Sequence, residues 1–290
     1  MTMLDFSKIT IVSITGLQSI ASGALRSIMH SAEQMPGAKC LLLSPEKPKE
    51  TPEWVKHSSV KPFGYLEYSI FILYSLTDFI ETEFALVVQD DGWVVSLDGW
   101  RNDFYRYDYI GAPVHLARIT KNQSTIYEHG FGWVNYLGDA DAQIENIFNG
   151  GFSLRSKKLL DAPRKLKLNF EIPCPDVNIA EPYGLHWKNM DVLEDVWLCL
   201  SARRKLEESG IIFPGLEVAK HFSVEHKGPI LHHADALPEV FGHHSKLRKL
   251  TALEPKEITY LCSKEFAQTV YGENSIINLF QNRGYKINWP

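Results

Sequence analysis

Short apolar runs alternate with amphipathic stretches along the first ninety residues. The runs are typical of buried strands, and the stretches place apolar side chains three or four positions apart, as helices do. We expect strands over residues 8–15, 40–43 and 60–63, and helices over residues 18–34 and 66–80. A further apolar strand, from residue 85, follows the second helix directly. This alternation predicts an α/β fold with a mostly parallel central sheet flanked by helices, and ligands bind such sheets at the C-terminal ends of their strands.

The regular pattern weakens after residue 95. Residues 105–114 predict a strand or turn that ends in Gly-Ala-Pro. Residues 116–148 are polar, aromatic and glycine-punctuated without a sustained period, so we expect a long insertion or mobile loop there. Beyond it we expect a helix that opens at residues 149–156 and runs through residue 160, a helix over residues 193–208, and a short strand over residues 211–213.

Composition places the chain among ordinary soluble globular proteins. Its 290 residues suit one large α/β domain or one domain with an appended lobe, with 44% hydrophobic and 22% charged residues. A net charge of -5 gives no general attraction to nucleic acid or anionic lipid. The four cysteines form no C-x-x-C pair, the first residues lack the features of a signal peptide, and no apolar window is long enough for a membrane span. We therefore expect a soluble cytoplasmic protein with reduced thiols and no integral membrane association.

The segment ALVVQDDGWVV, residues 85–95, is the strongest chemical signal in the chain. Its apolar run ends in Gln89, Asp90 and Asp91. Two carboxylates held close raise each other's pKa, and a divalent cation or a phosphate–metal complex would relieve that cost. A solvated turn after a strand is the simpler alternative for an isolated Asp-Asp pair.

Two later pairs suggest further contacts. Gly150 and Gly151 precede the expected helix, where their main-chain N–H groups can approach a ligand, and Arg155 offers a fork of donors to phosphate or carboxylate. An ordinary turn is the alternative. Glu194 and Asp195 open another expected helix, where the helix dipole favours carboxylates. Their functional alternative is a general base that takes a proton from an acceptor hydroxyl.

Histidines gather in the C-terminal part of the chain. Surface or packing positions explain any one of them, but their density in a chain with a carboxylate pair favours one imidazole metal ligand. The positions, with the neighbouring glutamate, are His221, Glu225, His226, His232, His233, His243 and His244. The sequence has no H-E-x-x-H, Walker or G-x-S-x-G motif and no G-x-G-x-x-G after a strand, which excludes most proteases, kinases, dehydrogenases and α/β-hydrolases.

In this order, the motifs resemble a bacterial domain-of-unknown-function family of GT-A-like glycosyltransferases. The matching segments are FILYSL (71–76), ALVVQDDGWVV (85–95), YDYIGAPV (107–114), NGGFSLRSKKLL (149–160), ED (194–195), HFSVEH (221–226) and FGHH (241–244). The resemblance, over roughly residues 8–245, implies one GT-A-like (Rossmann-like) domain at residues 1–250. Its parts would be a nucleotide-sugar-binding half (1–114), an insertion (115–148) and an acceptor-side catalytic half (149–250), followed by a C-terminal extension (251–290).

The same resemblance implies a metal-assisted donor site. GT-A enzymes hold a divalent cation, Mn²⁺ or Mg²⁺, with a D-x-D motif at a strand end, and the matching triplet here is Gln89-Asp90-Asp91. The resemblance therefore implies that Asp91 is a metal ligand and that Gln89 contacts the ribose or a metal-bound water. Asp90 would occupy the variable middle position of the motif. A late histidine completes the metal shell in such enzymes, and the F-G-x-H pattern gives that role to His244.

Catalytic and donor-contacting residues complete the expected site. Glu194 or Asp195 would be the catalytic base. The donor's base and ribose are expected over the end of the first strand. The resemblance places either the acceptor or the donor sugar against the paired glycines. The residues expected to contact the donor are Thr15, Gly16, Gln89, Asp90, Gly150, Gly151 and Arg155.

The predicted reaction moves a hexose or pentose from a nucleotide-diphosphate sugar to a hydroxyl of a glycan or glycoconjugate. We expect inversion, because a carboxylate pair that opens a helix suits a single in-line displacement. A nucleotidyltransferase is one alternative, although residues 15–27 lack its compact glycine-rich signature. A non-catalytic sugar-nucleotide-binding module is another, with Gln89 as the mark of a degenerate site. A nucleic-acid base or a protein could also be the acceptor; Lys246, Arg248 and Lys249 offer only a small basic edge for nucleic acid.

Overall fold

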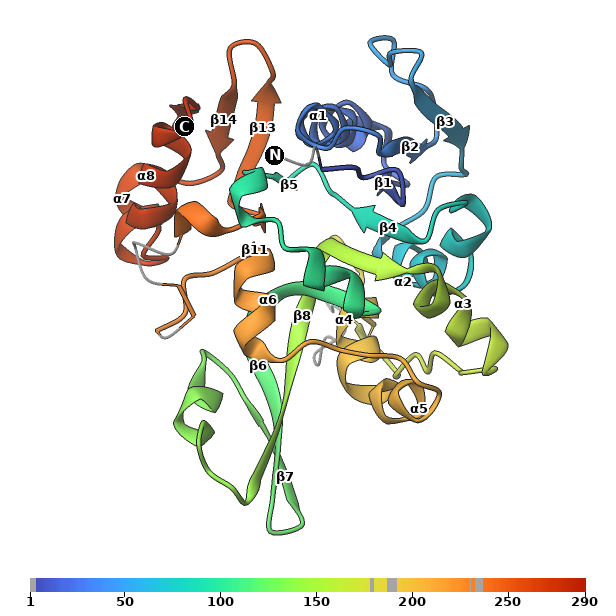
Figure 1. Cartoon of the computed structure of the whole chain (residues 1–290), viewed down its shortest axis with the longest axis vertical. Helices are drawn as coiled ribbons and strands as arrows, with labels where there is room; N and C mark the ends of the chain where they lie inside the picture. The colour runs from blue at the N-terminus through green and yellow to red at the C-terminus, as the bar shows by residue number, and fades with distance from the viewer. Residues whose placement is uncertain (1–3, 178–179, 187–191, 230, 233–236) are drawn as a thin grey trace.

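A seven-stranded mixed sheet forms the centre of the protein (Figure 1). The computed structural model describes residues 4–177, 180–186, 192–229, 231–232 and 237–290. In spatial order the strands are β3 (Val55–Ser59), β2 (Lys39–Ser44), β1 (Ile9–Ile14), β4 (Phe84–Val87), β8 (Ala142–Ser156), β6 (Tyr109–Lys121) and β7 (Ser124–Glu128). The first four pair in parallel, whereas β8, β6 and β7 pair antiparallel. The predicted α/β class is confirmed, and the parallel character belongs to the N-terminal side of the sheet.

Helices cover both faces of the parallel strands. Successive side chains of a strand point to opposite faces, so Ile11 packs with α1 (Gln18–Gln34) and Val12 packs with α2 (Tyr65–Tyr74). Because neither face meets water, β1 is apolar almost throughout. The other helical segments before the C-terminal part are α3 (Lys157–Lys165), α4 (Glu194–Val196), a π-helical turn (Trp197–Ser201), α5 (Arg203–Glu208) and α6 (Leu216–Phe222). Across the described part of the chain, no helix is long and apolar enough to cross a membrane.

The segment expected to be a long loop is an antiparallel extension of the sheet. Strands β6 and β8 run on beyond the core and, with β7, form the elongated hairpin at the lower end of Figure 1. Its own small core holds the fully buried Trp133 against Ala117 and Ile119. The apolar residues meet across paired strands, so no period is visible along the sequence. The expectation of irregular structure over residues 116–148 is therefore wrong.

The motif NGGFSLRS is also strand. Residues 149–156 form the end of β8, and α3 begins only at Lys157. The hydroxyl of Ser156 accepts the N–H of Leu159 at 3.0 Å and so caps the helix. The predicted helix opening at the paired glycines is therefore wrong, although its end at residue 160 falls inside α3.

Small sheets join the C-terminal part to the core. One consists of β5 (Gly92–Val94), β12 (Gly242–His244) and β11 (Ser223–Val224). Another consists of β13 (Arg248–Ala252), β14 (Glu257–Tyr260) and β15 (Lys286–Asn288), beside α7 (Lys264–Thr269) and α8 (Asn274–Asn282). A two-stranded pair consists of β9 (Asp176–Val177) and β10 (Leu185–His186). Pairing of β5 with β12 sets His244 opposite Gly92, one residue after the predicted carboxylates.

Three further predicted elements differ from the structure. The third strand is β3, not residues 60–63, because this edge strand is polar and partly exposed and carries no apolar run. The helix expected to reach residue 80 ends at Tyr74 and continues as a 3-10 helix. Residues 211–213 form no regular strand; instead the main chain of Ile212 bonds to Asp108. The 3-10 helices are Leu76–Phe79, Leu97–Gly99, Asn102–Arg106, Gly132–Tyr136 and Leu237–Glu239.

Candidate functional site

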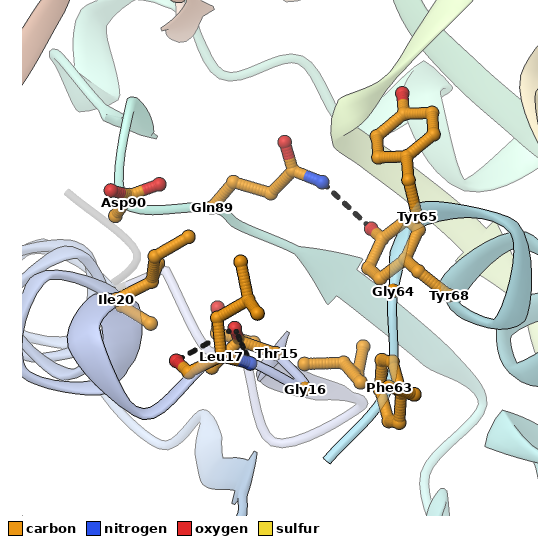
Figure 2. Close-up of a pocket in the computed structure, with 13 residues that line it drawn as sticks. Thr15, Gly16, Leu17, Ile20, Phe63, Gly64, Tyr65, Tyr68, Gln89 and Asp90 are labelled. Carbon is orange, nitrogen blue, oxygen red and sulfur yellow. Dashed lines mark hydrogen bonds between the residues drawn. The ribbon is translucent and has the colours of Figure 1, made fainter. Parts of the chain in front are cut away.

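A pocket of about 190 Å³ lies at the C-terminal ends of β1 and β4. Its lining includes Thr15, Gly16, Gln89 and Asp90, four of the residues expected to contact a donor (Figure 2). Gly16 is required there by space, since a Cβ at this position would lie 2.3 Å from the carbonyl oxygen of Phe63. The fold therefore brings the ends of two strands to one cavity, as expected for parallel strands that share an edge.

Two stacked tyrosines form one wall of this pocket. The rings of Tyr65 and Tyr68 lie 6.2 Å apart and within 19° of parallel. Tyr68 is buried, whereas Tyr65 is 64% exposed and presents an aromatic surface at the pocket mouth. The Nε2 atom of Gln89 donates a hydrogen bond to the Tyr68 hydroxyl at 2.8 Å (Figure 2). Neither tyrosine stands out in the sequence, because the positions of their rings follow only from the packing of α2 on the sheet.

Gln89 also belongs to a polar cluster around His244. The Nε2 atom of His244 lies 3.2 Å from Gln89 Oε1 and 3.3 Å from Asp91 Oδ1. Its Nδ1 atom lies 3.5 Å from Glu225 Oε1. Burial disfavours the charged imidazole, but the two carboxylates outweigh burial and raise the pKa of His244 to about 10. The structure thus joins three predicted residues and adds Glu225, which the sequence placed only among the His-rich positions.

This cluster presents three donor atoms suited to a divalent cation. Asp91 Oδ1 is buried, and apart from its ion-pair contact with His244 it has no hydrogen-bond partner within the described residues. It converges with Gln89 Oε1 on the Nε2 edge of His244, while Glu225 faces the other ring nitrogen. A histidine ligand usually has its second nitrogen oriented by a carboxylate in this way. No group of three or more His, Cys, Asp or Glu side chains among the described residues is placed to hold a metal, so the amide oxygen of Gln89 is essential to the fit.

The paired glycines separate this cluster from a second one. A Cβ on Gly151 would lie 2.3 Å from His244 Nε2 and 2.7 Å from Gln89 Oε1. A Cβ on Gly150 would instead lie 2.3 Å from Glu194 Oε1. Both glycines are therefore required by close approach rather than by a left-handed backbone. The sequence suggested a ligand-approach turn before a helix for this pair, whereas the structure places both glycines within β8.

The second cluster contains a buried ion pair. Arg155 Nη2 donates to Glu194 Oε1 at 2.9 Å and to the carbonyl of Gly150 at 3.2 Å. The two charged side chains are 1% and 4% exposed. The guanidinium also lies 5.2 Å from the ring centre of Tyr109. Arg155 is thus buried in β8, and protein groups occupy the Nε and Nη2 donors that the sequence suggested for a phosphate or carboxylate ligand.

Asp195 stands next to this pair and keeps some exposure to solvent. Its Oδ2 atom accepts the N–H of Gly150 at 3.0 Å, and its Oδ1 atom accepts the N–H of Val196 at 2.7 Å. Burial and the neighbouring charge of Glu194 raise the pKa of Asp195 to about 7, against the smaller effect of these N–H donors. A carboxyl that titrates near neutrality can act as a general base at physiological pH.

Asp90 points away from both clusters. Its carboxylate forms an ion pair with Lys249 of β13, and burial raises its pKa despite this partner. Among the other histidines, His221 is half-buried, and His226 packs edge-on against the ring of His115. His232 contacts the carbonyl of Lys220, and His243 packs against aromatic rings. The remaining one, His233, lies outside the described residues.

Comparison with known proteins gives a family. No curated protein sequence matches the chain. The family model described as "Protein of unknown function (DUF5672)" matches residues 67–244. This match begins in α2, includes the Gln89–Asp91 triplet, and ends at His244, so it contains both clusters. Since it also spans more than half of the sequence, the chain belongs to the DUF5672 family of proteins of unknown function.

Proposed function

We propose that the protein is a GT-A-like glycosyltransferase that moves a sugar from a nucleotide-diphosphate donor to a hydroxyl acceptor. The observation that carries this proposal is the arrangement around the paired glycines. On one side Gly151 borders a cation-suited cluster beside a pocket with an aromatic wall. On the other side Gly150 borders Asp195, a carboxyl group whose pKa is raised to about 7. Glycosyl transfer needs both a neutralised diphosphate and a base for the acceptor.

The pocket is the proposed place of the nucleoside. Tyr65 offers a flat, exposed ring, and stacking on such a ring suits a nucleobase or a sugar. The main chain at Thr15 and Gly16 forms the floor at the end of β1. A nucleoside held there would direct its phosphates toward the end of β4, where Asp91 lies.

The proposed metal ligands are Asp91, His244 and the amide oxygen of Gln89. Glu225 would orient His244 through its Nδ1 atom. A divalent cation bound by these residues would supply charge neutralisation for the leaving diphosphate. The metal-ligating atoms of these three residues lie on the Gly151 side of the paired glycines, whereas the proposed base, Asp195, lies on the Gly150 side.

Asp195 is the proposed general base. Glu194 forms the ion pair with Arg155 and is almost fully buried, whereas Asp195 is partly exposed to solvent. In an inverting reaction the acceptor hydroxyl would lose its proton to Asp195 as its oxygen forms the bond to the anomeric carbon. The bond from that carbon to the diphosphate oxygen would break in the same step.

The first test is a search for the donor. Melting temperatures measured with a panel of nucleotides and nucleotide sugars, with and without Mn²⁺, should rise with the correct donor, because a ligand that binds only the native state stabilises it. That donor should then be hydrolysed slowly in the presence of Mn²⁺. Absence of a shift with every nucleotide and nucleotide sugar would reject the proposal.

A non-catalytic sugar-nucleotide-binding module is the second candidate. The observation that favours it is Gln89, an amide where a D-x-D motif has a carboxylate. Such a module would show the same donor-dependent stabilisation but no hydrolysis or transfer. Replacement of Asp195 by Asn separates the two, since it should abolish turnover by an enzyme while leaving donor binding in place.

A further inference from the structure

Strand β13 lies next to the proposed donor site although it falls outside the family match. The match ends at residue 244, and β13 spans Arg248–Ala252. Figure 1 shows β13 beside α1. The side chain of Arg26 in α1 donates from Nε to the carbonyl of Leu250 at 2.9 Å, which fixes the strand there. The C-terminal part of the chain is therefore in place to contribute to the pocket.

Lys249 of β13 reaches the pocket lining. Its ammonium forms an ion pair with Asp90 Oδ2, and Asp90 lines the pocket. The lysine side chain is 36% exposed, against 13% for the aspartate. Asp90 has little room to move on its other side, since a Cβ on Gly23 of α1 would lie 2.9 Å from the Asp90 Cβ. The aspartate is therefore a fixed partner, whereas the lysine keeps access to solvent at the rim.

The site is rich in carboxylates and has few cations available to neutralise a bound diphosphate, and Lys249 can supply one. The carboxylates there are Asp90, Asp91, Glu194, Asp195 and Glu225. Of the cationic groups, Arg155 is buried against Glu194, and the ring of His244 lies between two carboxylates. A nucleoside diphosphate adds at least two further negative charges to this acidic surrounding. Lys249 is more exposed than either of those cations and can turn toward it.

We propose that Lys249 binds the diphosphate of the nucleotide-sugar donor, exchanging its ion pair with Asp90 for one with the phosphate oxygens. This inference rests on the proposed function and extends it to a residue outside the family match. In this arrangement Asp90 holds the ammonium at the rim and competes with the ligand for it. The lysine ammonium is a compact charge on a flexible stem, which suits such an exchange.

The test compares two variants that lack the competing carboxylate. Replacing Lys249 alone would leave Asp90 unpaired beside the ligand, so its effect would mix two causes. The comparison is therefore between Asp90→Asn and Asp90→Asn/Lys249→Gln, with uridine, guanosine, adenosine and cytidine diphosphates titrated calorimetrically in the presence of Mn²⁺. We expect the double variant to bind the preferred diphosphate about tenfold or more weakly than the single variant, the usual loss for a hydrogen bond to a charged group.

Controls separate this inference from the proposed function. Lys264→Gln removes an exposed lysine of α7 and should bind like the wild type. Lys249→Arg keeps the charge and should retain most of the affinity. Equal affinity of the single and double variants, with melting temperatures showing both folded, would overturn the role of Lys249. Failure of the wild type to bind any nucleoside diphosphate would instead overturn the proposed function.

Discussion

The buried Arg155–Glu194 pair should dominate the stability of the site. The pair has a single 2.9 Å contact, side chains that are 1% and 4% exposed, and further bonds from Arg155 to Gly150 and Ser153. Removing one partner leaves the other charge buried and uncompensated, which costs about 3–5 kcal/mol. For a chain of this size about 1 kcal/mol lowers the melting temperature by roughly 2 °C, so Arg155→Met or Glu194→Leu should each lower it by roughly 6–10 °C.

The double variant gives the sharper result. Arg155→Met/Glu194→Leu removes both charges, and the carbonyl of Gly150 still accepts a hydrogen bond from the Ser153 hydroxyl at 2.8 Å. Replacement of a whole buried pair by apolar side chains is often close to neutral, so the double variant should be more stable than either single variant. Urea unfolding of all four proteins closes the double-mutant cycle.

A matched control lies on the surface. Arg204 and Glu208 on α5 form an exposed pair, with side chains 84% and 66% exposed. Arg204→Met should change stability by about 0–1 kcal/mol. If Arg155→Met costs no more than this control, or if the costs of its two single variants simply add, the reasoning about the buried pair is refuted.

Three further predictions concern the reaction and the cation. Turnover should rise with pH through about 7, because Asp195 is protonated below its raised pKa and becomes a base above it; a rate that is flat between pH 5 and 9 would contradict the assignment. Gly151→Ala places a Cβ 2.3 Å from His244 Nε2, so it should weaken Mn²⁺ binding measured by calorimetry and cost about 1–3 kcal/mol of stability. His244→Ala should abolish any Mn²⁺-dependent rise in melting temperature, whereas His221→Ala should retain it; equal shifts in both would remove His244 from the cation site.

The sequence predicted the elements whose signals are local. Helix α1 has the predicted bounds, because a complete apolar stripe is closed by Pro36 and Gly37. The end of β4 was equally clear, since an apolar run stops at Gln89. The β6–β7–β8 region was missed because its core forms only when distant strands pair. The burial of Arg155 was not predictable for a related reason, because no local sequence pattern distinguishes a buried arginine in a strand from an exposed one.

The candidate site likewise contains residues that the sequence indicates and partners that only the fold brings to them. The adjacent carboxylates, the paired glycines and the late histidine were visible as residue types, and the structure brings Gln89, Asp91, Gly151 and His244 together. The partners that complete each cluster come from elements far away in sequence. The contact of Lys249 with Asp90, for example, joins residues 159 positions apart. No spacing rule connects such positions, because the distance between them is set by how α1 packs on β13.

The two adjacent glycines of β8 also determine the distance between the two clusters of side chains. One faces Glu194 and Asp195, its neighbour faces His244 and Gln89, and a single peptide unit separates the two environments. The spacing between the two groups of side chains is therefore set by covalent geometry and not by a loop. A slip of β8 by one residue against β4 would exchange the faces of the whole strand. The register of β8 against β4 therefore determines not only how the sheet folds but also which part of a ligand would face the proposed metal ligands and which part would face the proposed base.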